Sequence, residues 1–337
     1  MTIDAGGSRS AIGVGVAIDF APGSGATFGA RLDHVLPVVE AAEALGYGTL
    51  SAGESYVDAV GDRMGFHAPN ALMMLAAVAA RTNSIRLVTG AALLSAWNTR
   101  RLAYDACLLD QISDGRVILG LGLGRPEQWE RFGAPVADLS EHVDTMIVEL
   151  RRLFGEVVPG PVQAGGPPIW IGGSAPRSAR RAATLGDGYT ASTGYSFDTV
   201  ATMARRYRSA LGEQTGGRPT VSVNRLAVIA ATDSEASRRA AAGAEPLARA
   251  YIAAGTTRSI DRTASFDEIH PQLGLVGTPD QVRATVRRYV EAGVTDFQLR
   301  VVPGATEVRH AIESLELFSA EVWPAFGATD TGPRGRS

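Results

Sequence analysis

Residues 109–124 read Leu-Asp-Gln-Ile-Ser-Asp-Gly-Arg-Val-Ile-Leu-Gly-Leu-Gly-Leu-Gly, and they lead from the end of a helical pattern into a mostly apolar strand. Leu102, Ala106, Leu109 and Ile112 recur every three or four residues, which is the spacing of one face of an amphipathic helix. Residues 116–121 form a short apolar run that is typical of a buried strand. The stretch therefore predicts one helix–turn–strand unit of an alternating α/β fold.

The same alternation continues from Ile12 almost to the C terminus. Eight strands alternating with helices within 337 residues predict a (β/α)₈ barrel. Residues 234–254 follow a helical pattern, whereas residues 255–277 show no clear period and predict an irregular insertion before the last strand. The predicted strands cover residues 12–18, 47–52, 85–89, 116–121, 168–171, 188–191, 221–230 and 296–301.

A doubly wound open sheet is the structural alternative to the barrel. Its dinucleotide-binding motif requires Gly-x-Gly-x-x-Gly, but Gly120, Gly122 and Gly124 stand at equal two-residue spacing. The motif is absent, so the sequence favours the barrel.

The charged residues exclude several classes of enzyme. The chain has 32 basic and 35 acidic residues, and every basic residue is arginine. Schiff-base aldolases, pyridoxal-phosphate enzymes and P-loop NTPases need a lysine amine, which arginine does not replace. The net charge of -3 and the lack of a basic run also argue against a nucleic-acid partner.

Cysteine and histidine give no sign of a metal site. Cys107 is the single cysteine, so neither an internal disulfide nor a thiolate cluster is expected. The histidines lack the spacing of metal ligands. They are His34, His67, His142, His270 and His310.

The two ends of the chain are polar, and we expect disordered tails at residues 1–11 and 327–337 around one domain at 12–326. Residues 1–10 contain no apolar segment of the kind found in signal peptides, and no apolar run is long enough to span a membrane. We therefore expect a soluble protein in the cytoplasm.

Catalytic groups of such barrels lie at the C-terminal ends of the strands. Asp19 and Glu54 follow two of the predicted strands, and either one is a candidate general acid or base. A salt bridge to a nearby arginine is the alternative role for both.

The segment Gly172-Gly-Ser-Ala-Pro-Arg-Ser178 follows the fifth predicted strand. Two glycines allow a close backbone approach, and a helix start beside Arg177 attracts an anion. The segment predicts a phosphate site made by Gly172, Gly173, Ser174, Ala175 and Arg177, with an ordinary capped helix start as the alternative.

Further candidates follow other strands. Phe66 and Trp97 are candidate apolar walls, and Arg125 suits an anionic or carbonyl-bearing substrate. His67 is the one histidine near the predicted site. The chain lacks the Gly-x-Ser-x-Gly motif of common serine hydrolases.

Several motifs, taken together, resemble the luciferase-like monooxygenase superfamily. They cover residues 75–90, 109–124, 167–173 with 185–188, and 276–282 with 292–296, in family order over nearly the whole chain. The superfamily comprises barrel enzymes that use FMN or the deazaflavin coenzyme F-420. Residues 18–22 and 250–277 resemble most the branch of the F-420-dependent methylenetetrahydromethanopterin reductase.

This resemblance implies a site for the cofactor. It implies a non-prolyl cis peptide at Gly90-Ala91 that backs the flavin ring, with Glu54 and Gly122 nearby. It also strengthens the assignment of the phosphate to the turn after the fifth strand, with Ser192 close to it.

Two positions depart from the family pattern. The family usually has an acid followed by histidine where this chain has Glu54-Ser55, so Ser55 joins the candidate substrate contacts. Several deazaflavin members have an acid at the position of Arg125. Asp19 matches a glutamate thought to donate a proton in the reductase branch.

The main hypothesis is an oxidoreductase that moves a hydride between FMN or F-420 and a small organic substrate, with Asp19 or Glu54 handling the proton. One alternative is a two-component FMN-dependent monooxygenase served by a separate flavin or F-420 reductase. Another is a non-redox or catalytically degenerate barrel that binds a cofactor. The resemblance also implies a homodimer.

Overall fold

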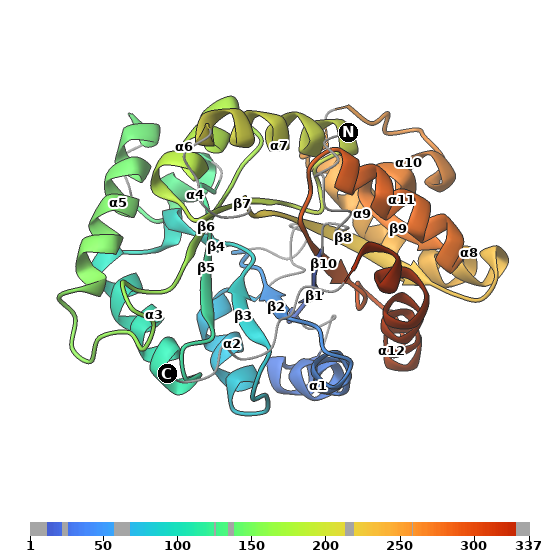
Figure 1. The fold of residues 1–337 in the computed structure, drawn as a ribbon, viewed down its shortest axis with the longest axis horizontal. Coiled ribbons are helices and arrows are strands. Elements are labelled where there is room, and N and C mark those ends of the chain that lie inside the picture. The colour runs from blue at the N-terminus through green and yellow to red at the C-terminus, as the bar shows by residue number, and fades with distance from the viewer. Residues whose placement is uncertain are drawn as a thin grey trace.

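The computed structural model describes residues 12–21, 26–56, 68–124, 126–133, 138–212, 219–257 and 259–327. Within these residues, eight parallel strands form the middle of the molecule and helices surround them (Figure 1). The barrel strands, in spatial order, are β1 (Gly13–Ile18), β2 (Thr49–Ala52), β3 (Arg86–Thr89), β5 (Val117–Gly122), β6 (Ile169–Gly172), β7 (Gly188–Ala191), β8 (Val221–Ile229) and β10 (Asp296–Arg300).

The first and last strands close the barrel. Gly13 of β1 lies opposite Asp296 of β10, and Gly15 of β1 lies opposite Thr49 of β2. β10 also pairs with β8 from Asp296↔Ser222 onward. The predicted (β/α)₈ barrel is therefore confirmed, and all eight predicted strands are present within two residues of their expected ends.

Helices cover the outside of the barrel between successive strands (Figure 1). Polar side chains begin several of them: Thr27, Asn70 and Asn98 accept hydrogen bonds from backbone N–H groups three residues later. The helices are α1 (Phe28–Ala44), α2 (Ala71–Ala79), α3 (Thr99–Ile112), α4 (Pro126–Arg131), α5 (Leu139–Phe154), α6 (Pro176–Leu185), α7 (Phe197–Leu211), α8 (Asp233–Ala242), α9 (Ala244–Ala253), α10 (Phe266–Leu273), α11 (Pro279–Glu291) and α12 (Val308–Leu317).

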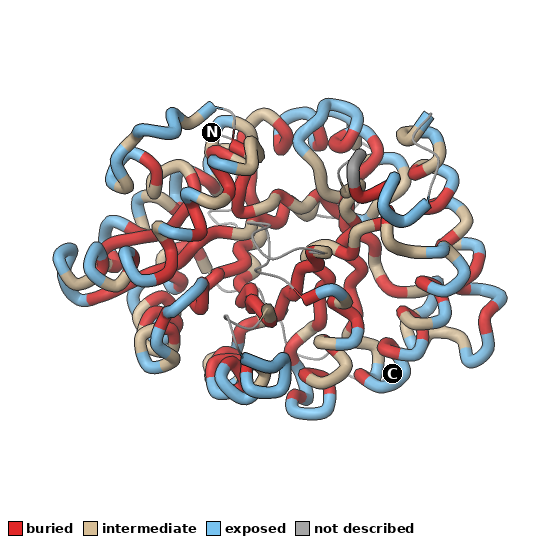
Figure 2. The backbone as a smooth tube through the Cα atoms, turned by 180° about the vertical axis from the view of Figure 1, so that it is seen from behind, coloured by how far each residue is buried: buried red, intermediate tan, exposed pale blue. Residues whose placement is uncertain are grey.

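The main hydrophobic core lies between the strands and this layer of helices. Figure 2 shows buried backbone in the middle and exposed backbone on the outer turns of the helices. The inside of the barrel holds a separate and much smaller apolar cluster of Val88, Ile118 and Trp170. The outer core therefore supplies most of the buried apolar surface. The inside of the barrel is thus able to hold polar side chains and a cavity.

The irregular insertion predicted at residues 255–277 is corrected by the structure. The segment contains α10 and the short strand β9 (Gly274–Gly277), which pairs with the second half of β8. The period is hard to detect because α10 has eight residues and contains Pro271. A capping box between Ser265 and Glu268 is the sequence signal that marks its start.

The single helix predicted at residues 234–254 is divided into α8 and α9 at Gly243. A Cβ atom at this position would lie 2.2 Å from the carbonyl oxygen of Pro303. The chain breaks the helix here because the loop after β10 passes directly over Gly243.

The predicted disordered tails, apart from Gly327, lie outside the described residues. Among the residues that are described, no helix combines the length and apolar character needed to cross a membrane.

The turn after β3 brings two strands unusually close. A two-residue strand, β4 (Ala92–Leu93), follows β3 and pairs with the end of β5. A Cβ atom at Gly120 would lie 2.0 Å from the carbonyl oxygen of Thr89. Glycine is therefore required at this position of β5, which lies against the C-terminal end of β3.

Candidate active site

A cavity of about 380 Å³ opens at the C-terminal ends of the strands. Such a cavity is the usual place for a binding site in this fold. The structure brings together ten of the predicted site residues in its lining: Glu54, Ser55, Gly90, Ala91, Gly122, Gly172, Gly173, Ser174, Ala175 and Ser192.

The peptide bond between Gly90 and Ala91 is cis, as the family resemblance predicted. The Ala91 carbonyl accepts a hydrogen bond from the backbone N–H of Glu54 at 3.2 Å. A Cβ atom at Gly90 would lie 3.1 Å from the Cβ of Ser51, and one at Gly122 would lie 3.2 Å from the Cβ of Ala91. The glycines therefore keep this wall of the cavity free of side chains.

The turn after β6 forms another wall of the cavity. Gly173 has a φ of 141°, and a Cβ atom there would lie 2.2 Å from the Ser178 hydroxyl oxygen. α6 begins after this turn with Ala175 as its N-cap residue, and the Ala175 side chain provides no capping hydrogen bond. Because the first N–H groups of a helix point outward and carry partial positive charge, this turn fits an anion such as a phosphate.

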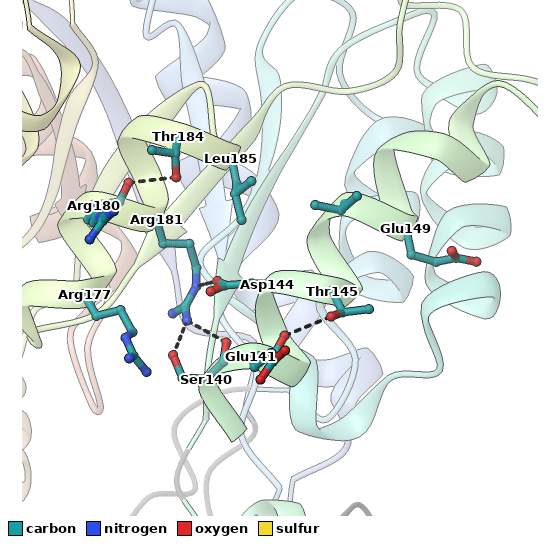
Figure 3. A pocket seen from close by; sticks show the side chains of 11 residues that line it. Ser140, Glu141, Asp144, Thr145, Glu149, Arg177, Arg180, Arg181, Thr184 and Leu185 are labelled. Atoms are coloured by element: carbon teal, nitrogen blue, oxygen red, sulfur yellow. Dashed lines mark hydrogen bonds and ion pairs between the residues drawn. The ribbon is translucent and has the colours of Figure 1, made fainter. Parts of the chain in front are cut away.

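Arg177 does not line the cavity. It lines a separate groove of about 670 Å³ between α5 and α6, on the outer layer of helices (Figure 3). In that groove Arg181 pairs with Asp144 and donates to Ser140. The position of Arg177 in this outer groove gives no support to its predicted phosphate interaction, and the backbone of the turn remains the candidate anion site.

Glu54 is 5% exposed and lies at the edge of the cavity beside Ala91. In the described part of the chain its carboxylate accepts four hydrogen bonds. The donors are the N–H of Ala71 at 3.1 Å, the N–H of Leu93 at 2.8 Å, the indole of Trp97 at 3.1 Å and the hydroxyl of Tyr56 at 3.3 Å. The carboxyl group is thus fixed by segments that follow β2 and β3.

Burial raises the pKa of Glu54 to about 7, even though its four donors act in the opposite direction. A carboxyl group with a pKa near 7 exists in both protonation states at neutral pH. This property is common in catalytic acids and bases.

The other predicted substrate contacts are placed differently. Trp97 is not part of the cavity lining, because its indole N–H is directed at the Glu54 carboxylate. Phe66, His67 and Arg125 lie outside the described residues.

Asp19 does not line the cavity either. It is 3% exposed, and its carboxylate oxygens accept hydrogen bonds from Arg300 Nε at 3.0 and 2.9 Å. Arg300 also donates to the hydroxyl of Tyr251 at 2.7 Å, and Tyr251 lines the cavity. The predicted proton donor is therefore a partner in a buried ion pair outside the cavity lining, which is the alternative role that the sequence left open.

Several residues of the cavity were not identified from the sequence. Ser51, Ser222 and Gln298 come from neighbouring parts of the barrel, on β2, β8 and β10. The Ser51 and Ser222 hydroxyls and the Gln298 Oε1 atom are buried without a hydrogen-bond partner among the described residues. Buried polar atoms are normally satisfied, so these atoms fit a bound group that offers its own donors and acceptors.

The sequence does contain a signal for two of these residues, because polar and apolar residues alternate along β8 and β10. Ser222 and Asn224 alternate with apolar residues in β8, as Gln298 and Arg300 do in β10. The inside of such barrels is normally filled by branched apolar side chains, so polar residues at the inward positions indicate a hollow core.

Among the described residues that line the cavity, none is basic. In the same described residues no group of three His, Cys, Asp or Glu side chains is placed to hold a metal ion.

The model of the luciferase-like monooxygenase family matches residues 12–296. The chain belongs to this family. The matched region contains every barrel strand except most of β10.

Relatives of this luciferase-like protein use different cofactors. An F420-dependent glucose-6-phosphate dehydrogenase from Nocardia farcinica is 27% identical over 296 residues, which cover 78% of this chain and 85% of the relative. The oxygenase component of a flavin-dependent trigonelline monooxygenase from Acinetobacter baylyi is 26% identical over 303 residues, covering 79% and 83%.

The reductase branch that the sequence resembles is also represented. A 5,10-methylenetetrahydromethanopterin reductase from Methanolobus tindarius is 23% identical over 289 residues, covering 74% of this chain and 86% of the relative. The crystal structure of the monooxygenase RslO1 from Streptomyces bottropensis superposes with a TM-score of 0.81 at 24% identity. It covers 94% of this chain and 100% of that chain, which supports the fold.

The Asp19→Asn substitution should destabilise the protein by about 3–5 kcal/mol, because it leaves the Arg300 guanidinium buried without a carboxylate. Urea unfolding measures the loss. Asp105→Asn, in the exposed pair with Arg101, is the matched control and should cost less than about 1 kcal/mol. Equal losses in the two variants would contradict the role of the buried pair.

Glu54 should make the stability depend on pH. The folded state holds the Glu54 proton more tightly than the unfolded chain, so the free energy of unfolding falls as the pH rises from about 4.5 to about 7. The loss amounts to about 3 kcal/mol at 1.36 kcal/mol per pKa unit. Glu54→Gln should lack this loss. In urea unfolding, the free energy of unfolding of the variant should therefore rise relative to that of the wild type as the pH increases from about 4.5 to about 8.

The exposed residue Glu291 provides the control for this comparison. Glu291→Gln should follow the wild-type dependence on pH. If the curve of Glu54→Gln also runs parallel to the wild type, Glu54 titrates at its ordinary pKa.

Proposed function

We propose that this luciferase-like protein is an oxidoreductase that transfers a hydride between a flavin-type cofactor, FMN or F420, and a small organic substrate. The observation that carries the proposal is one cavity with two features on its walls. One wall has the uncapped start of α6 at Gly172–Ala175, and the other has the Gly90–Ala91 peptide with the buried Glu54. One relative that is F420-dependent and another that is flavin-dependent support it.

Two parts of the cavity bind two parts of the cofactor, the phosphate and the ring. The turn from Gly172 to Ala175 holds the phosphate through backbone N–H groups, with Ser192 also in the lining, and the side-chain-free surface at Gly90 and Ala91 supports the ring. The bound ring supplies the hydride chemistry, whereas the protein supplies orientation and electrostatics.

Glu54 handles the proton of the reaction. It lies next to the ring-supporting peptide, and its pKa of about 7 allows it to give or take a proton at neutral pH. Asp19 is left out of this role because both of its carboxylate oxygens are bound by Arg300.

The polar inner end of the cavity favours an uncharged ligand group. Ser51, Ser222 and Gln298 offer hydrogen bonds without charge, and no basic side chain among the described lining residues faces them. We infer that a carbonyl or hydroxyl group of the substrate or cofactor binds here. Arg125, which lies outside the described residues, remains a contact predicted from the sequence for a carbonyl or anionic substrate group.

A two-component FMN-dependent monooxygenase is the second candidate. The relative from Acinetobacter baylyi, an oxygenase component, supports it over 79% of the chain. In that case a separate reductase supplies the reduced flavin. Measuring oxygen consumption by the reduced, loaded protein in the presence of substrate separates the candidates, because oxygen would be a co-substrate of the monooxygenase alone.

We infer a homodimer through the outer face of α3. We also propose the cytoplasmic location that the sequence led us to expect. Tyr104, Leu108 and Ile112 lie four residues apart on α3 and are 44%, 53% and 53% exposed. Met73, 64% exposed, lies on the neighbouring α2. A stripe of this kind is typical of a protein–protein interface.

Leu108→Glu should convert the dimer to a monomer, because it places a charge in the middle of the stripe. Light scattering coupled to size-exclusion chromatography measures the mass. Val158→Glu, at an exposed apolar residue outside α3, is the control and should leave the mass unchanged. A monomeric wild type would refute the dimer.

Ala175→Asp tests the phosphate site. The aspartate caps α6, so stability should be equal or higher, while its charge should repel the phosphate and weaken FMN or F420 binding at least about tenfold. Riboflavin, which lacks the phosphate, should bind wild type and variant equally in fluorescence titrations.

Ala175→Asn is the matched variant, because it caps the helix without charge and should weaken binding less than Ala175→Asp. Equal binding of FMN and F420 to the wild type and to Ala175→Asp would place the phosphate elsewhere. A wild type that binds neither cofactor would remove the basis of the proposed function.

A further inference from the structure

Tyr56 connects Glu54 to the cavity. Its hydroxyl donates to Glu54 Oε2 at 3.3 Å, and both residues line the cavity. The ring packs edge-on against Phe132 with centroids 4.8 Å apart, and Arg131 donates to the Tyr56 carbonyl oxygen at 3.1 Å. These contacts hold the hydroxyl between the carboxyl group and the space in which a ligand binds.

The other three partners of Glu54 can only donate hydrogen bonds. The N–H groups of Ala71 and Leu93 and the indole N–H of Trp97 have no lone pair with which to accept a proton. All four partners suit the ionised carboxylate. When Glu54 is neutral, the Tyr56 oxygen is the one acceptor for its proton among these described partners.

The elements packed around Glu54 add no other charged partner within the described residues. α2 and β4 contribute backbone N–H groups, and the short 3₁₀ helix η1 (Leu94–Ala96) leads to the Trp97 indole. Arg100 and Arg101 at the start of α3 are exposed. Arg131 donates to the backbone of Tyr56 and not to the carboxyl group.

We propose that Tyr56 is the proton relay between Glu54 and a basic atom of a ligand in the cavity. The inference rests on the proposed function, in which the reaction needs a proton donor or acceptor. In one direction the Tyr56 O–H bond breaks as its proton joins the ligand atom. The Glu54 O–H bond breaks as its proton passes to the Tyr56 oxygen, and the negative charge ends on Glu54.

The reverse direction restores both O–H bonds and leaves Glu54 neutral. Burial, together with the nearby Glu54, raises the pKa of Tyr56 above its usual value, so the phenol remains protonated outside the transfer. The carboxylate formed in the forward direction is stabilised by the same four donors that hold it in the structure.

Infrared difference spectra between pH 5 and pH 9 test the contact on the full chain as purified. The carbonyl band of protonated Glu54 is identified by its absence in Glu54→Gln. Tyr56→Phe keeps the ring contact with Phe132, and it should move this band to higher wavenumber, because neutral Glu54 loses its acceptor. Tyr104→Phe, at a tyrosine on the outer face of α3, should leave the band in place.

A band that stays in place in Tyr56→Phe would overturn the relay. Because this measurement needs no cofactor, its result can be told apart from a failure of the proposed function. In the loaded enzyme Tyr56→Phe should lower kcat about 10²-fold, with the KM and the Kd of the cofactor unchanged. An unchanged kcat would also overturn the relay, as would a loss confined to KM.

Discussion

The pairing of the first barrel strand with the last one is the constraint on which the rest of the structure depends. β1 and β10 are separated by most of the chain, and a buried ion pair between Asp19 and Arg300 joins their C-terminal ends. Arg31 of α1 reinforces the junction, since it donates to the carbonyl oxygens of Asp19 and Val302. With the ring of strands closed, the loops after them meet around one cavity.

Among the described residues, few apolar side chains point into the closed barrel. The small cluster of Val88, Ile118 and Trp170 occupies one side, whereas Ser51, Ser222 and Gln298 occupy the other. Unsatisfied polar atoms in the core lower the stability of a protein. The large apolar core between strands and helices provides the stability that allows such a hollow, polar interior.

The cavity has two kinds of feature: backbone turns that shape its walls, and side chains that hydrogen-bond to Glu54. The glycine turn before α6 and the cis peptide after β3 are backbone features of the cavity wall. The proposed proton transfer depends instead on a few side chains around Glu54. Among these side chains, Tyr56 contacts the carboxyl group through its hydroxyl.

The sequence by itself determined the order of strands and helices, the glycines at positions 90, 122, 172 and 173, and Glu54 as a carboxylate at a strand end. These features follow from local periodicity and from motifs, which a linear sequence contains. Only the tertiary structure decided that Asp19 belongs to an ion pair and that Arg177 lies in an outer groove. It alone revealed the partners of Glu54, because burial and hydrogen bonding between residues distant in the chain depend on how the barrel closes.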